Sequence, residues 1–115
     1  MVTIFDVIAE AKEAAVAGTA DYVENVLGGE DAYPCGFAWV TIYEYEGKKI
    51  RKNSKIGKAL QFAGAKKSDY EGGFRIWNPS GTMLQNLDCK EAGARAAADV
   101  LTKYGFTAYG GGRMD

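Results

Sequence analysis

The segment EAGARAAADVL, residues 91–101, sets the tightest limit on how this 115-residue chain can fold. Five alanines and one glycine among these residues favour a helix with very little side-chain bulk on its surface. Its predicted buried stripe follows three- and four-residue spacing and consists of Ala92, Ala96, Val100, Leu101 and Tyr104. Because a helix this thin can approach another backbone closely, we expect it to pack tightly against its neighbours.

The residues before this helix predict a hairpin that leads into it. Phe74 to Trp77 has the composition of a short strand, and Asn78 to Gly81 carries residues that favour a type I turn. Thr82 to Leu87 then returns as the partner strand. Asp88 and Glu91 form a D-x-x-E pattern, which predicts the N-terminal cap of the helix.

A first helix is predicted near the N-terminus. Thr3 and Asp6 form a pattern close to a capping box, and Gly28 with Gly29 should end the helix. Gly18 lies in a gap of the apolar stripe and predicts a bend or a close crossing with another helix. The stripe itself consists of Ile4, Ile8, Ala11, Ala15, Tyr22 and Val26.

The aromatic and β-branched run that follows predicts a strand from Phe37 to Tyr45. Both of its faces are apolar, which favours a central strand over an edge strand. One face would carry Phe37, Trp39, Tyr43 and Tyr45, and the other would carry Ala38, Val40 and Ile42.

Two shorter elements complete the prediction. Ser54 is suited to cap a second helix that Gly64 ends. Its predicted buried side consists of Ile56, Ala59, Leu60 and Ala63, while Lys55 and Lys58 stay outside. Phe106 to Tyr109 is the predicted last strand, and the ending GGGRMD is predicted to be a mobile tail unless a partner or ligand fixes Arg113.

The predicted order of helices and strands is therefore α-β-α-β-β-α-β in a single domain, residues 1–115. This order is typical of the α+β class, with a small antiparallel sheet of about four strands covered by three helices. No apolar run approaches the roughly 20 residues that a membrane span needs, and the N-terminus lacks the pattern of a signal peptide. We expect a soluble, cytoplasmic protein.

The composition argues against several chemistries. The chain has no histidine, so the usual neutral-pH base and the commonest metal ligand are both missing. Cys35 and Cys89 are too few to indicate a disulfide framework, although the start of a helix would favour the thiolate of Cys89. The glycine runs fit neither a phosphate-binding P-loop nor a dinucleotide fingerprint. We predict no catalytic residue, no metal and no cofactor.

The charges are strongly sorted along the sequence. Residues 1–46 hold nine acids and one base, whereas residues 47–67 hold eight bases and no acid. This basic segment is either a solvated surface that complements the acidic first helix, of the same chain or of a neighbouring subunit, or a patch for phosphate groups. The predicted patch consists of Lys48, Lys49, Arg51, Lys52, Lys55 and Lys58.

One group of residues suggests a ligand site around the predicted turn. An aromatic ring, amide and hydroxyl groups, and cations together suit a ligand that has a flat ring and a phosphate. The predicted site consists of Trp77, Asn78, Ser80, Lys90 and Arg95, with Arg75 beside it or on the other face. Folding offers a competing explanation, in which Trp77 is a core residue, the turn accounts for Asn78 and Ser80, and Arg95 pairs with Glu91.

Two resemblances add expectations about function. Phe74 to Leu101 resembles the end of a double-stranded RNA-binding domain, although only Lys90 matches the basic cluster of that family. The motifs GFAW, IWNPSG, DCKEAGARA and YGG with GRMD are similar to small proteins of tailed bacteriophages, a group with no assigned activity. This second resemblance implies an intracellular viral accessory protein that acts on host defence or metabolism by binding.

Three hypotheses of function follow. The first is a non-enzymatic, homo-oligomeric protein, most simply a dimer, that binds a small phosphate-bearing ligand such as a nucleotide or nucleotide signal. The second is a nucleic-acid-binding accessory protein that uses the basic segment at residues 48–67. The third is a protein–protein interaction module without a small ligand.

Overall fold

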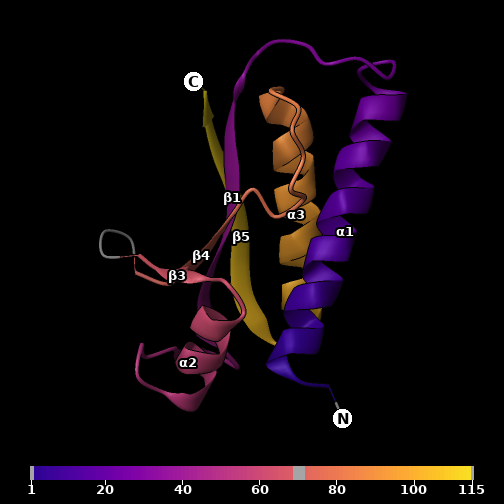
Figure 1. Ribbon diagram of the computed structural model, residues 1–115. Helices are drawn as coiled ribbons and strands as arrows, with labels where there is room; N and C mark the ends of the chain where they lie inside the picture. Colours follow the sequence, from indigo (N-terminus) through magenta and orange to yellow (C-terminus); the bar gives the residue numbers. More distant parts are fainter. Residues whose placement is uncertain (1, 69–71, 115) are drawn as a thin grey trace.

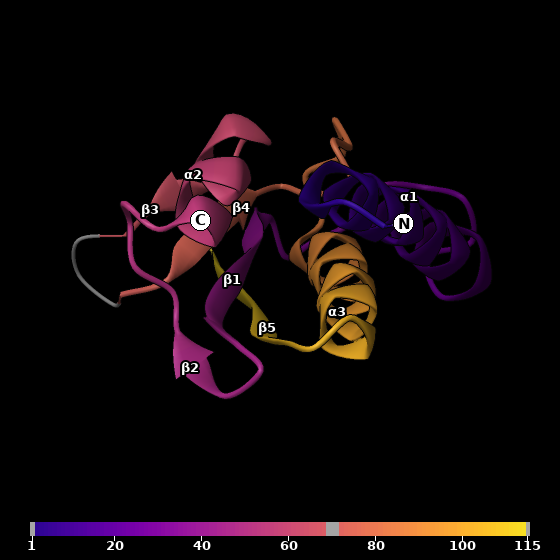
Figure 2. The same cartoon turned by 90° about the horizontal axis from the view of Figure 1, so that it is seen from below.

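The computed structural model describes residues 2–68 and 72–114, and it consists of an antiparallel sheet packed against helices (Figure 1). The elements in chain order are α1 (Ile4–Asn25), β1 (Gly36–Tyr45), β2 (Lys48–Lys49), α2 (Lys55–Phe62), β3 (Lys66–Lys67), β4 (Phe74–Trp77), α3 (Leu87–Lys103) and β5 (Phe106–Met114). Helix α3 lies between α1 and the strands β1 and β5 (Figure 2). Residues of all three helices share one core with the sheet.

The predicted α+β class is confirmed, with five antiparallel strands and three helices. The predicted order of elements is kept when β2 is taken with β1 as one hairpin. Strand β1 is central as expected, because it pairs with β4 on one side and with β5 on the other. Strand β3 pairs with β4, and β2 pairs with the end of β1. In the described part of the chain, no helix is long and apolar enough to cross a membrane.

The predicted start of α1 is confirmed by a complete capping box. The Thr3 hydroxyl accepts a hydrogen bond from the Asp6 N–H at 3.1 Å, and the Asp6 carboxylate accepts one from the Thr3 N–H at 3.0 Å. Most of the predicted stripe faces the core, but Val26 is 60% exposed because it is already the C-terminal cap, where the helix has run past the core. The buried residues of this helix are Val7, Ile8, Ala11, Ala15 and Thr19.

Helix α3 is buried on two sides, which the predicted single stripe did not anticipate. Ala92, Ala96 and Val100 are only half-buried, while the residues that face the core include Ala94, Ala97, Ala98 and Leu101. The expected close approach to another helix is confirmed. A Cβ built on Gly93 would lie 2.9 Å from the Ala15 carbonyl oxygen of α1, and one built on Gly18 would lie 3.0 Å from the Ala96 Cβ.

The predicted hairpin is half right. The turn is present, since the Gly81 N–H donates to the Asn78 carbonyl at 2.9 Å. The return strand predicted for Thr82 to Leu87 is wrong, because β4 takes β1 and β3 as its neighbours instead. The chain after the turn is held by Asp31, whose carboxylate accepts hydrogen bonds from the N–H groups of Gln85 and Asn86.

The predicted cap of α3 is wrong by two residues. Asn86 is the N-cap, and its side-chain oxygen accepts a hydrogen bond from the Cys89 N–H at 2.8 Å. Asp88 lies instead in the first turn, where its charge suits the helix dipole. The cap of α2 is as predicted, because the Ser54 hydroxyl accepts a hydrogen bond from the Gly57 N–H.

Residues 110–114 belong to a strand and not to the predicted mobile tail, whose last residue, Asp115, lies outside the described residues. Strand β5 extends the predicted Phe106–Tyr109 to Met114, and its pairing with β1 runs as far as Gly36 opposite Met114. Gly110 allows this, because a Cβ there would lie 3.0 Å from the backbone nitrogen of Arg95 in α3.

A register shift between Ile42 and Glu44 corrects the predicted faces of β1. This irregularity turns Tyr45 into the core, where its ring packs 4.7 Å from the ring of Phe106. Tyr45 therefore does not share the face of Phe37, Trp39 and Tyr43. We call the side of the sheet that carries Ala38, Val40 and Ile42 the inner face, and the opposite side the open face.

The close packing of α3 on α1 gives a test by substitution. Gly93→Ala should lower the free energy of unfolding by about 1–3 kcal/mol, because the new methyl group overlaps α1. Gly18→Ala is the matched comparison and should cost less, because its Cβ would come no closer than 3.0 Å to the Ala96 Cβ, whereas a Cβ on Gly93 would overlap the Thr19 Oγ1. Alanine at position 18 also gains up to about 1 kcal/mol of helix propensity. Urea unfolding of both variants measures the difference. Equal stability of the two variants would contradict the close packing of α3 on α1 at Gly93.

Candidate functional site

Lys90, a predicted ligand residue, is buried and has a structural partner. Only 7% of it is exposed, and its Nζ donates a hydrogen bond to the Gly36 carbonyl at 2.9 Å. The ammonium group also lies 5.6 Å from the centre of the Phe37 ring. Lys90 therefore joins the start of α3 to the start of β1 and does not belong to a site around Trp77.

Arg95 is exposed on α3 but is not near the predicted turn. Its backbone packs against Gly110 of β5, whereas Trp77 belongs to β4, which lies on the other side of β1. Arg95 also forms no ion pair with Glu91 in the described part of the chain, although the competing explanation from folding expected one. Of the five predicted residues, only Trp77, Asn78 and Ser80 lie together.

These three residues line a groove of about 580 Å³ beside β4, which we call the β4 groove. Cations reach it from separate parts of the chain, since Lys12 comes from α1 and Lys66 from β3. Arg75 of β4 is a third basic residue in the lining. Apolar contact surface is provided by Val16, Ile76 and Pro79.

Part of the edge of β4 is open toward this groove. The Asn78 N–H donates to the Ala38 carbonyl at 2.9 Å, so the backbone groups of Asn78 point toward β1. Neighbouring residues of an antiparallel strand point their N–H and C=O groups in opposite directions, so those of Trp77 point away from β1. Strand β3 reaches only Phe74 and Arg75. Within the described chain, the backbone of Trp77 therefore has no strand partner on that side.

The polar side chains of the turn serve folding first. The Asn78 amide donates to the Thr82 carbonyl at 3.1 Å, and the Ser80 hydroxyl oxygen accepts a hydrogen bond from the Thr82 N–H at 3.3 Å. Asn78 also has a positive φ of 44°, a conformation that asparagine tolerates better than most residues. The Ser80 hydroxyl keeps its own proton available to a ligand.

Trp77 is part of an aromatic ladder on the open face. Its ring stacks on Trp39 with centroids 5.4 Å apart and lies 5.6 Å from the ring of Phe37. The guanidinium of Arg75 lies 4.4 Å from the centre of the Trp39 ring. Trp77 is 50% exposed, so it is neither the isolated platform nor the core residue that the sequence allowed. It forms the border between the ladder and the β4 groove.

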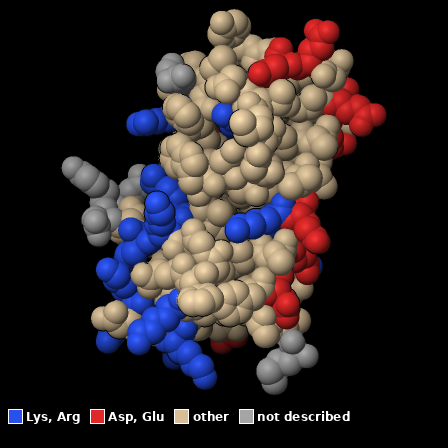
Figure 3. All heavy atoms as spheres, in the orientation of Figure 1, with Lys and Arg blue, Asp and Glu red and all other residues tan. Residues whose placement is uncertain are grey.

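The predicted basic patch is fully on the surface, with all six of its residues exposed. Figure 3 shows Lys and Arg gathered on the side of β2, α2 and β3, while Asp and Glu line α1. Between described residues, the one ion pair joins Lys103 and Glu10. The bases of residues 48–67 therefore form no ion pair with a described carboxylate.

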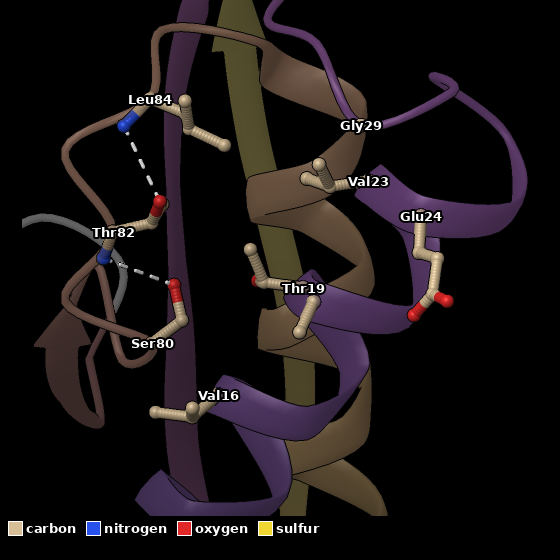
Figure 4. A pocket seen from close by; sticks show the side chains of 9 residues that line it. Val16, Thr19, Val23, Glu24, Gly29, Ser80, Thr82 and Leu84 are labelled. Carbon is tan, nitrogen blue, oxygen red and sulfur yellow. Dashed lines mark hydrogen bonds between the residues drawn. The ribbon is translucent and has the colours of Figure 1, made fainter.

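A second hollow of about 410 Å³ lies between α1 and the chain after the turn. Figure 4 shows Val16, Thr19 and Val23 of α1 facing Ser80, Thr82 and Leu84. The hydroxyl oxygens of Ser80 and Thr82 accept hydrogen bonds from the backbone of this loop. The hollow is thus largely apolar and has no cation in its lining.

The two cysteines differ in burial, since Cys35 is half-buried and Cys89 is fully buried. No group of three or more Cys, Asp or Glu side chains there could hold a metal ion. Burial raises the pKa of the Cys89 thiol, and the charge of Asp31 acts in the same direction. The favourable dipole expected at the start of α3 is outweighed by this burial.

Sequence reasoning missed Lys12 and Lys66 as residues of the groove. Lys12 is the single base among residues 1–46, and this exception in an acidic segment was the available signal. Lys66 was part of the basic segment but had no mark that separated it from its neighbours. Its place in the groove depends on the pairing of β3 with β4.

Comparison with known proteins gave no match to a family model, to a curated protein or to a solved structure. The resemblances to phage proteins and to double-stranded RNA-binding domains therefore stay predictions.

The different burial of the two thiols gives a second test. We expect a thiol reagent at mildly alkaline pH to modify Cys35, which is half-buried, and to leave Cys89 unmodified until the protein unfolds. Cys35→Ser should abolish labelling of the folded protein, whereas Cys89→Ser should not change it. Mass spectrometry of the labelled protein measures both. Rapid labelling of Cys89 in the folded protein would contradict its burial.

Proposed function

We propose that this protein binds a small phosphate-bearing ligand with a flat ring, such as a nucleotide, in the β4 groove. The observation that carries the proposal is that the edge of β4 at Trp77 has no strand partner in the described chain and lines the same hollow as Lys12 and Lys66. A backbone N–H and two ammonium groups around one hollow are suited to the oxygens of a phosphate.

The remaining lining suits the rest of such a ligand. The ring of Trp77 and the apolar groups of Val16 and Pro79 provide contacts for a flat ring. The Ser80 hydroxyl can donate a hydrogen bond to a ring nitrogen or a sugar oxygen. Among the described residues, the lining contains neither a carboxylate nor a thiol, which favours binding over chemical conversion. Sequestration of a host nucleotide signal is one use that we propose for a phage accessory protein of this kind.

A second candidate, binding of nucleic acid, is favoured by a different observation. Eight bases of residues 48–67 lie within one segment and form no ion pair with the described residues. A single nucleotide would use only the two or three cations of the β4 groove. A longer polyanion would use the rest, and its affinity would fall steeply with salt.

The proposed site is tested by substitution of the two lysines. Lys12→Gln and Lys66→Gln should each weaken nucleotide binding by about 1.5–3 kcal/mol, the contribution of a charged hydrogen bond. Lys58→Gln is the matched control, because this exposed lysine lies outside the groove. Arg95→Ala should also leave the affinity unchanged. Calorimetric titration with mono-, di- and cyclic nucleotides measures these affinities.

Two outcomes would contradict the proposal. An effect of Arg95→Ala without an effect of Lys66→Gln would place the site away from the β4 groove. No binding by the wild-type protein at millimolar nucleotide would remove the proposed function itself.

A further inference from the structure

The open face of the sheet carries aromatic side chains in neighbouring rows. The register places Trp77, Trp39 and Gly111 in one row across β4, β1 and β5. The next row contains Lys66, Arg75, Thr41 and Tyr109 across β3, β4, β1 and β5. On the other side of the tryptophan row, Phe37 lies opposite Arg113. The described helices pack on the inner face, so these rows form an outer surface (Figure 1).

Gly111 makes this surface continuous. A Cβ on Gly111 would lie 3.0 Å from the Trp39 Nε1, so the indole of Trp39 lies over the glycine. Tyr109 and Arg113 flank Gly111 on the same face of β5, because they are two residues away along the strand. The indole of Trp39 therefore fills the space between an exposed tyrosine and an exposed arginine.

Folding accounts for only some of these rings. Phe37 and Trp39 are half-buried and pack in the ladder, where each ring covers part of the next. Tyr109 is 64% exposed and makes one ring contact, with Tyr43 at 6.1 Å. Trp77 is 50% exposed beside the β4 groove. Two large rings thus remain open to solvent at opposite sides of the ladder.

The charged residues around the exposed rings indicate which kind of partner fits the open face. Lys66 and Arg113 lie at the margins of the open face, and Arg113 also lies 5.9 Å from the Phe37 ring centre. The acidic residue Glu44 of β1 accepts a hydrogen bond from the Thr107 hydroxyl and lies opposite Lys49 of β2 in the register. Exposed rings bordered by cations are complementary to a chain that carries both flat bases and phosphates.

We infer that the β4 groove is one end of a longer track, and that the open face binds single-stranded nucleic acid. This inference rests on the proposed function, because the groove takes one nucleotide unit of the strand. The base of that unit packs on Trp77 and the base of a following unit packs on Tyr109, and the phosphates lie toward Lys66 and Arg113. A duplex does not satisfy this surface, because its bases are already stacked and paired inside the helix.

Both tryptophans of the chain belong to the ladder, which provides a direct optical readout. A single-stranded DNA or RNA of about twelve nucleotides, within the range of known single-strand sites, should quench tryptophan fluorescence on binding. A duplex of the same sequence should not. Tyr109→Ala should weaken binding of the single strand about tenfold, the scale of one stacked base, while Tyr109→Phe keeps the wild-type affinity.

The controls separate this inference from the proposed function. Tyr33→Ala removes an 88% exposed tyrosine that lies outside the open face and should have no effect. Tyr109→Ala should leave the affinity for a mononucleotide unchanged, because Tyr109 does not line the β4 groove. Lys66→Gln should weaken the binding of both ligands. Circular dichroism verifies that each variant is folded.

Each outcome of this experiment supports or overturns the inference. If the mononucleotide and the single strand bind with equal affinity, and Tyr109→Ala has no effect, the longer track is overturned. The proposed function would still stand in that case. If duplex and single strand bind with equal affinity and neither quenches the fluorescence, the inferred track is overturned. Electrostatic attraction of phosphates to the basic segment would then explain the binding. No binding of either ligand would overturn both.

Discussion

The close approach of α3 to its neighbours is the contact on which the rest of this structure depends. Gly93 lets the backbone of α3 approach α1, and Gly110 lets β5 approach α3. Because α3 is thin, it fits between a helix and a sheet and leaves α1 near enough to share the same core. All the described helices then lie on the inner face. The open face is a direct consequence, since no helix remains to cover it.

Local signals were sufficient to predict the class and much of the fold from the sequence. The caps at Thr3 and Ser54 and the turn at residues 78–81 depend on hydrogen bonds within four residues. Predictions failed where a distant segment decided the outcome. Asn86 replaced Asp88 as the cap because Asp31 fixes the backbone of the preceding residues. The glycine-rich ending became a strand because the whole length of β1 was available to pair with it.

The candidate site shows the same division between local and distant effects. Trp77, Asn78 and Ser80 lie together because they are neighbours in the sequence, and any turn there would group them. Lys90 and Arg95 were assigned to the site because they belong to the helix that follows the turn. Burial on two sides places Lys90 under the start of β1 and Arg95 beside β5. The cations that do reach the groove come from α1 and β3, and no local pattern connects those segments.

The aromatic ladder stabilises an uncovered sheet face, and this role accounts for Phe37 and Trp39. Each of these rings loses contact with water by packing on its neighbours, so they need no further partner. Packing in the ladder does not explain Tyr109, which is 64% exposed. At such a position a small polar residue would stabilise the fold equally well. Nor does packing explain why the margins of the ladder are basic, since the rings alone would pack equally well beside neutral residues. The fold does not require an exposed ring beside cations that form no ion pair with the described residues, and this combination is therefore the feature that we assign to a ligand.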